Sequence, residues 1–80
     1  MMSSEFVLHR SVSFSLLAEI ANQCSAFHSE IYLVKGHRKV DAKDIVDLVT
    51  LSLHPSDRIG LIVEGSDAQV ASEKVLGLLN

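Results

Sequence analysis

The stretch RIGLIVEGSDAQVASEKVLGLL, residues 58–79, changes from a strand pattern to a helix pattern and decides the fold. Its first eight residues alternate between two sides, as expected of a strand with one buried face. The apolar residues on that side are Ile59, Leu61 and Val63. Residues 65–67, Gly-Ser-Asp, then combine a turn with a helix N-cap. The apolar stripe of the C-terminal helix that follows, which ends at Asn80, is Val70, Ala71, Val75 and Leu78.

The N-terminal part of the chain shows the same change of period. Residues 5–9 alternate, with Phe6 and Leu8 on one side, which predicts a short strand. A helix of three or four turns follows, with Ser11 or Ser13 as its N-cap, because a serine there satisfies a free backbone N–H of the first turn. Its apolar stripe is Leu17, Ile20, Ala21, Cys24 and Phe27.

The middle of the chain reads as a hairpin followed by a helix. Residues 30–35, EIYLVK, are rich in β-branched and aromatic side chains, and Gly36-His37 forms a turn into a strand at 38–41. The stretch DIVDLVTLSL, residues 44–53, predicts a helix that Asp44 caps and Pro55 closes.

The predicted order is therefore β-α-β-β-α-β-α. This order is typical of an α+β open-faced β-sandwich, in which a four-stranded antiparallel sheet is covered on one face by three helices. No repeat, low-complexity tract or linker interrupts the chain, so residues 1–80 are expected to form a single domain.

Composition narrows the possible functions. The chain has 80 residues and a net charge of −3, which argues against a nucleic-acid binder that relies on a basic face. No apolar run is long enough for a membrane span and no signal peptide is indicated, so we expect a cytoplasmic protein without membrane contact. Cys24 is the only cysteine and falls in an apolar stripe, which favours a core role. The four histidines are scattered, so no metal site or cofactor is predicted.

The helix predicted at 44–53 carries more large apolar residues than one buried face needs. They are Ile45, Val46, Leu48, Val49, Leu51 and Leu53. Some of them should be exposed, either as a contact site for another protein or at the edge of a wide core seam. The helix alone favours neither alternative.

Three stretches in this register resemble the family of HPr, the histidine-containing phosphocarrier protein of the bacterial phosphoenolpyruvate:sugar phosphotransferase system. The resemblance covers the chain from Phe6 to Leu79. The stretches are EIYLVKGHRKV (30–40), VDAKDIVDLVTLSL (40–53) and RIGLIVEGSDAQVASEKVLGLL (58–79). The resemblance implies the HPr-like open-faced sandwich and a protein that is not itself an enzyme.

The family's signature, Gly-x-His-Ala-Arg-Pro, is not retained. There the phosphoryl group sits on a histidine at the start of a helix, where backbone N–H groups and an arginine stabilise its charge. In this chain the histidine falls on Ser13, the alanine on Phe14, the arginine on Ser15 and the proline on Leu16. The only arginine nearby in sequence is Arg10. The resemblance therefore implies a phosphoryl site without its reactive groups.

A second family position, a serine that a kinase phosphorylates in some bacteria, falls on Asp44. An aspartate there carries one permanent charge where phosphoserine carries more, so it could act as a weak constitutive mimic. The alternative is that Asp44 serves only as a helix cap, a position that aspartate favours, and the two roles can coexist.

The resemblance also implies a docking face around the old phosphoryl site, provided that Phe14 and Leu16 face solvent rather than packing under the next loop. The predicted contact residues are Phe14, Leu16, Ile45, Val46, Thr50 and Leu51. Our leading hypothesis is a protein-binding or regulatory module that has lost the phosphocarrier site. Its partner would be a phosphotransferase-system enzyme or a transcriptional regulator.

Two alternatives stay open. The chain could be a phosphocarrier that uses another residue, such as His9 or His54, although neither is predicted at a helix N-terminus. It could also be a structural domain that forms a homodimer.

Overall fold

Four strands and three helices follow one another in the predicted order. The computed structural model describes all residues 1–80 and shows seven elements. They are β1 (Met2–Val7), α1 (Phe14–Cys24), β2 (Glu30–Lys35), β3 (Arg38–Asp41), α2 (Ile45–Thr50), β4 (Arg58–Glu64) and α3 (Ala68–Leu79). The predicted fold class, an α+β open-faced sandwich, is confirmed.

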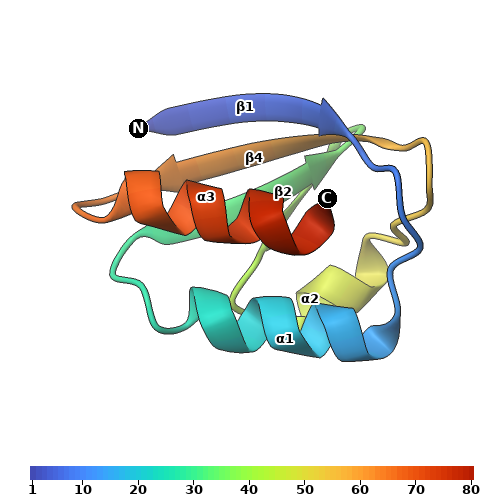
Figure 1. Ribbon diagram of the computed structural model, residues 1–80, viewed down its shortest axis with the longest axis horizontal. Helices are drawn as coiled ribbons and strands as arrows, with labels where there is room; N and C mark the ends of the chain where they lie inside the picture. The colour runs from blue at the N-terminus through green and yellow to red at the C-terminus, as the bar shows by residue number, and fades with distance from the viewer.

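The sheet is antiparallel throughout, with the strand order β1-β4-β2-β3. Leu33 of β2 lies opposite Leu61 of β4, and Ile31 lies opposite Val63. Because side chains alternate along a strand, these four residues point to the same face, and all are buried. All three helices lie on that side of the sheet (Figure 1).

The helices complete the core with one stripe each. In α1 four residues of the predicted stripe are buried, namely Leu17, Ile20, Ala21 and Cys24. Its fifth member, Phe27, lies beyond the end of the helix and is only partly buried. Burial raises the pKa of the Cys24 thiol to about 11, so it stays protonated at neutral pH. The α3 stripe is displaced from the prediction. Residues at helical spacing around Val75 are buried, including Ala71 and Leu79, whereas Val70 is 57% exposed.

Two predicted boundaries were wrong. β1 spans residues 2–7 rather than 5–9, because its ladder with β4 runs from Met2 opposite Val63 to Val7 opposite Arg58. Helix α2 ends at Thr50, so Pro55 does not close it. None of the three helices is long and apolar enough to cross a bilayer.

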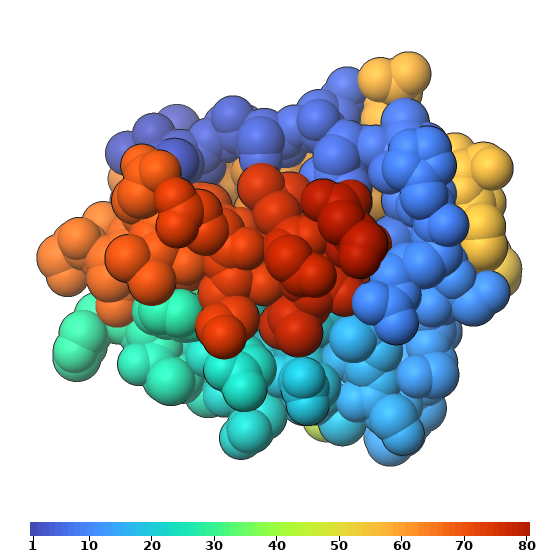
Figure 2. Space-filling model, viewed as in Figure 1, coloured from blue at the N-terminus to red at the C-terminus, as the bar shows by residue number.

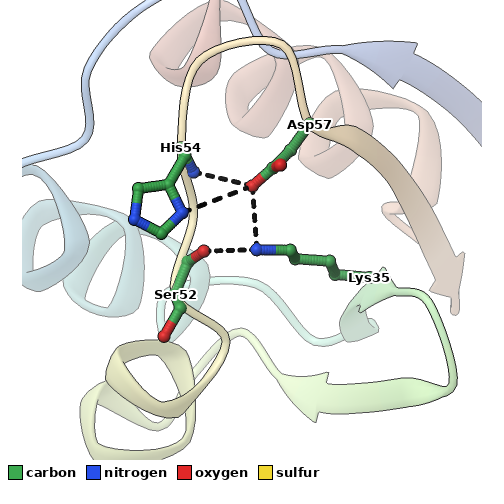
Figure 3. A network of polar contacts seen from close by, with 4 residues as sticks. All are labelled: Lys35, Ser52, His54 and Asp57. Atoms are coloured by element: carbon green, nitrogen blue, oxygen red, sulfur yellow. Dashed lines mark hydrogen bonds and ion pairs between the residues drawn. The ribbon is translucent and has the colours of Figure 1, made fainter.

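The loop between α2 and β4 contains two serines in the left-handed region. Ser52 has φ 54° and Ser56 has φ 78°, values that residues other than glycine rarely adopt. Lys35, at the end of β2, holds this loop (Figure 3). Its Nζ donates to the carbonyl of Ser52 and pairs with Asp57 Oδ2 at 2.9 Å. The same Asp57 oxygen accepts the backbone N–H of His54 at 2.7 Å, and these two bonds lower the pKa of Asp57.

A second polar contact joins two turns on the opposite side of the molecule. Asp67 occupies the N-cap position of α3, but its side chain makes no cap bond. Its carboxylate instead accepts the backbone N–H groups of His28 and Ser29, both at 2.9 Å, and the hydroxyl of the buried Ser29. The Ser29 hydroxyl and the two N–H groups lower the pKa of Asp67 to about 2. We call this contact the Asp67 clamp.

Gly65 is required beside the clamp. Its φ is 151°, and a Cβ built there would lie 2.5 Å from Ser29 Oγ. Both the backbone angle and the close approach exclude a side chain.

Figure 2 shows the face of the molecule that α3 and α1 form. On this face α3 lies along β1 on one side and above α1 on the other.

The left-handed serines predict a reversal of residue preference. At Ser52 and Ser56, glycine should give a free energy of unfolding about 1 kcal/mol higher than alanine, because only glycine adopts positive φ without steric cost. At Ser15, inside α1, the order should reverse by about 1 kcal/mol because alanine favours the helix. Urea unfolding of the six variants measures both differences. Equal stability of the glycine and alanine variants at Ser52 and Ser56 would contradict the assignment.

The Asp67 clamp predicts a specific loss of stability in acid. The pKa of Asp67 lies below its ordinary value of 3.8, so the clamp stabilises the fold fully above about pH 4 and is lost as the pH falls towards 2. Asp67→Asn should lower the urea midpoint at pH 6 and flatten its decline between about pH 4 and pH 2. Glu19→Gln, at an exposed position on α1, is the control and should leave the decline in place.

Candidate functional site

The start of α1 is where the resemblance places a phosphoryl site. Ser13 is the N-cap, with extended backbone angles of φ −82° and ψ 165°. Its Oγ accepts the backbone N–H of Leu16 at 3.1 Å. The prediction that a serine caps this helix is therefore confirmed, and the hydroxyl is engaged in holding the first turn.

No cationic side chain contacts Ser13. Arg10 points elsewhere, since its Nη1 donates to the carbonyl of Leu78 at the end of α3, 3.2 Å away. Ser15 is exposed and carries no charge. The helix end supplies backbone N–H groups, but the structure places neither an imidazole nor a guanidinium beside them. This site has no group that could accept a phosphoryl group as a labile phosphoimidazole.

An apolar face lies beside this helix start. Phe14 is 67% exposed, Val46 is 70% exposed and Val49 is 46% exposed. A shallow groove joins α1 to α2 here, and its lining residues are Phe14, Ile45, Val46, Val49 and Thr50. We refer to these five residues as the α2 face. Exposed apolar side chains gathered in this way are typical of protein contact sites.

Two residues predicted for this face lie elsewhere. Leu51 is only 3% exposed and belongs to the core, because it follows Leu48 by three residues and so lies on the buried side of the helix. Leu16 is partly buried and packs against the core. The site prediction missed Val49, although the spacing of three from Val46 was a usable signal.

The two ends of α2 carry opposite charges. At the N-terminal end, Asp44 Oδ1 accepts the backbone N–H groups of Val46 at 2.9 Å and Asp47 at 3.3 Å, which confirms Asp44 as the cap. At the C-terminal end, Arg38 of β3 donates through Nη2 to the Thr50 hydroxyl at 2.8 Å. Since Val46 and Thr50 both line the groove, a carboxylate and a guanidinium border the α2 face.

The basic residues in and beside the β2–β3 hairpin have specific partners. Lys43 Nζ donates to the carbonyl of Phe27 at 2.8 Å, and Lys39 Nζ lies 4.3 Å from the centre of the Tyr32 ring. The first contact joins the segment after β3 to the segment before β2, and the second lies within the hairpin. Arg38 remains at the edge of the α2 face.

The histidines do not replace the missing imidazole in this site. His54 lies in the α2–β4 loop, with Nδ1 3.8 Å from Asp57 Oδ2, and its side chain is largely exposed. Figure 3 shows the Ser52 hydroxyl pointing away from the imidazole, so these residues form no Ser-His-Asp nucleophile set. No group of three His, Cys, Asp or Glu side chains could hold a metal ion.

Comparison with known proteins identifies the family. Residues 15–80 match the family profile described as "PTS HPr component phosphorylation site", a match that starts two residues after Ser13. The chain is 36% identical over 62 residues to the HPr-like protein Crh of Halalkalibacterium halodurans, covering 78% of this chain and 74% of that protein. It is 34% identical over 58 residues to the HPr-like protein Crh of Bacillus subtilis, covering 72% of this chain and 68% of that protein.

Solved structures agree with this assignment. The phosphocarrier protein HPr of Bacillus anthracis superposes with a TM-score of 0.92 at 22% identity, covering 99% of this chain and 96% of that chain. The crystal structure of Bacillus subtilis Crh, which revealed a swapping domain in a dimer, gives a TM-score of 0.78 at 28% identity, with coverage of 99% and 91%. The fold, the matched profile and the curated relatives together establish that this chain belongs to the HPr family.

Proposed function

We propose that this HPr-family protein is a cytoplasmic protein-binding regulatory module of the phosphotransferase system that does not carry a phosphoryl group at residue 13. One observation carries the proposal: where the family signature has histidine, this chain has a serine whose hydroxyl caps α1 and has no cation beside it. A phosphoserine ester transfers its phosphoryl group far less readily than a phosphoimidazole. The position is therefore suited to structure rather than to relay.

The α2 face supports a binding role. Phe14 replaces the small alanine of the signature and is exposed, so the old reaction centre is bordered by a large apolar side chain. Together with Val46 and Val49 it forms a continuous apolar surface at the position where the family docks its partners. The partner we propose is a protein, namely a phosphotransferase-system enzyme. The alternative protein partner is a transcriptional regulator.

Asp44 supports a role that does not depend on phosphorylation. It stands at the family's regulatory serine and already places a negative charge at the N-terminus of α2, where the helix dipole favours an anion. Aspartate is not a substrate for a serine kinase. We propose that this chain holds a permanently charged form of that position, in addition to the cap.

A homodimer is the second candidate. The crystal structure of Bacillus subtilis Crh and a solid-state NMR structure of Crh are both of dimers, and so is a crystal structure of HPr from Thermoanaerobacter tengcongensis. An exposed apolar face on a chain of 80 residues is compatible with the same behaviour here.

Phosphorylation by the first enzyme of the phosphotransferase system tests the loss of the carrier site. With phosphoenolpyruvate and that enzyme, the wild-type chain should acquire no acid-labile phosphate. The double variant Ser13→His/Ser15→Arg should gain labelling, because it restores an imidazole and a cation at the start of α1. Phosphate and mass measurements before and after acid treatment provide the readout. Labelling of the wild-type chain at His9 or His54 would instead establish the carrier alternative.

A matched pair of valine variants tests the docking face. We expect the first enzyme of the system to shift the NMR signals of α2 and of the start of α1 when it is titrated into the ¹⁵N-labelled chain. Val46→Glu should weaken binding by about tenfold or more, because it places a charge at the centre of an apolar contact. Val70→Glu, at a similarly exposed valine on α3, should bind as the wild type does. Equal effects of the two substitutions would argue against the α2 face.

A further inference from the structure

The α2 face is bordered by a negative group at one end and a positive group at the other. Asp44 is exposed and tied to Val46, and Arg38 is exposed and tied to Thr50. Thr50 follows Asp44 by six residues, and a rise of about 1.5 Å per residue separates these two positions by about 9 Å along the helix axis. A ligand surface that matches this face therefore needs an apolar centre, a cation at one end and an anion at the other.

We propose that a second copy of this chain occupies the α2 face, with the two α2 helices packed antiparallel across a twofold axis. In this arrangement Val46 and Val49 of one copy lie against the same residues of the other. Asp44 of each copy lies near Arg38 of its partner copy, so the favourable charge contact occurs twice. A parallel arrangement places like charges together and is disfavoured.

The charges select a second copy over an external protein of uniform charge. A partner with a purely basic surface satisfies Asp44 but is repelled by Arg38, and a purely acidic surface has the reverse problem. A second copy of the same face, packed antiparallel, places an opposite charge beside both Asp44 and Arg38. The inference rests on the docking face proposed above and adds that self-association covers it, so only the monomer is free to bind another protein.

The small size of the face makes this dimer weak. A stable interface buries about 800 Å² on each partner, and five residues around a helix of two turns supply less than that. We therefore expect a dissociation constant on the order of 0.1–1 mM. This dimer also differs from a swapped one, because β1 stays paired with β4 of its own chain (Figure 1).

Sedimentation equilibrium of the full chain in low salt tests the proposal. Between about 20 μM and about 2 mM the average mass should rise from that of the monomer towards twice that value. Val46→Glu should remain monomeric over the whole range, whereas Val70→Glu should follow the wild type. A wild-type chain that stays monomeric at about 2 mM overturns the proposal, and so does a dimer that Val46→Glu leaves intact.

Charge exchange tests the orientation of the two copies. Arg38→Glu and Asp44→Lys should each weaken self-association by about tenfold, because each turns two attractive contacts into repulsive ones. An equal mixture of the two variants should recover the wild-type association, since both contacts in the mixed dimer then join opposite charges. Lys74→Glu on α3 changes the net charge as Arg38→Glu does and should have little effect.

A third variant guards against an effect on folding. If Asp44→Lys unfolds α2, Asp44→Asn keeps a capping side chain while removing the charge, and it should still weaken the dimer by a few-fold. Failure of the mixture to recover association, with both variants folded, overturns the antiparallel arrangement. The enzyme titration at about 50 μM, where the chain is mostly monomeric, is independent of these results, so the docking face and the dimer can fail separately.

Discussion

One face of the four-stranded sheet must be buried, and the rest of the structure follows from how three short helices meet that requirement. The pleat sends Leu33 and Leu61 from neighbouring strands to the same side, and the helices must cover the surface that they form. Helices α1 and α3, of eleven and twelve residues, each give a full stripe to this core. Helix α2 has six residues and buries only Leu48 of its own, so its outer side chains remain exposed beside the start of α1. The site that we assign to binding is thus the part of the helical layer that the sheet does not need.

Two groups of polar contacts, the Asp67 clamp and the bonds of Lys35, lie on either side of this helical layer. The Asp67 clamp fixes the turn before β2 against the turn before α3. Lys35 fixes the loop that returns from α2 to β4, including Ser52 and Asp57. Because both groups of contacts join loops at helix ends, they fix the positions of those ends without burying apolar surface. Lys35, a residue of the sheet outside the α2 face, therefore fixes the loop that leaves α2.

The sequence was most informative where structure is local. The hairpin of residues 30–41 and the caps at Ser13 and Asp44 depend on neighbouring residues, and they were predicted correctly. The start of β1 depends on its register with β4, which alternation in residues 5–9 alone cannot reveal. The end of α2 is followed by Ser52 in the left-handed region, a conformation that a glycine in the sequence would have indicated and a serine does not. The exchange of Leu51 for Val49 on the exposed side has another origin, namely helical spacing: Leu51 follows the buried Leu48 by three residues, and Val49 follows the exposed Val46 by three.

A carboxylate written into the sequence at Asp44 cannot be added by a kinase or removed by a phosphatase. Whatever response depends on that charge has no switch of its own and can vary only with the number of molecules in the cell. In the role that we propose for Asp44, the protein reports its own abundance: its output is set when the chain is synthesised and ends when the chain is degraded. Where a relative with a phosphorylatable serine is controlled by modification of the protein, this chain would be controlled through expression of its gene.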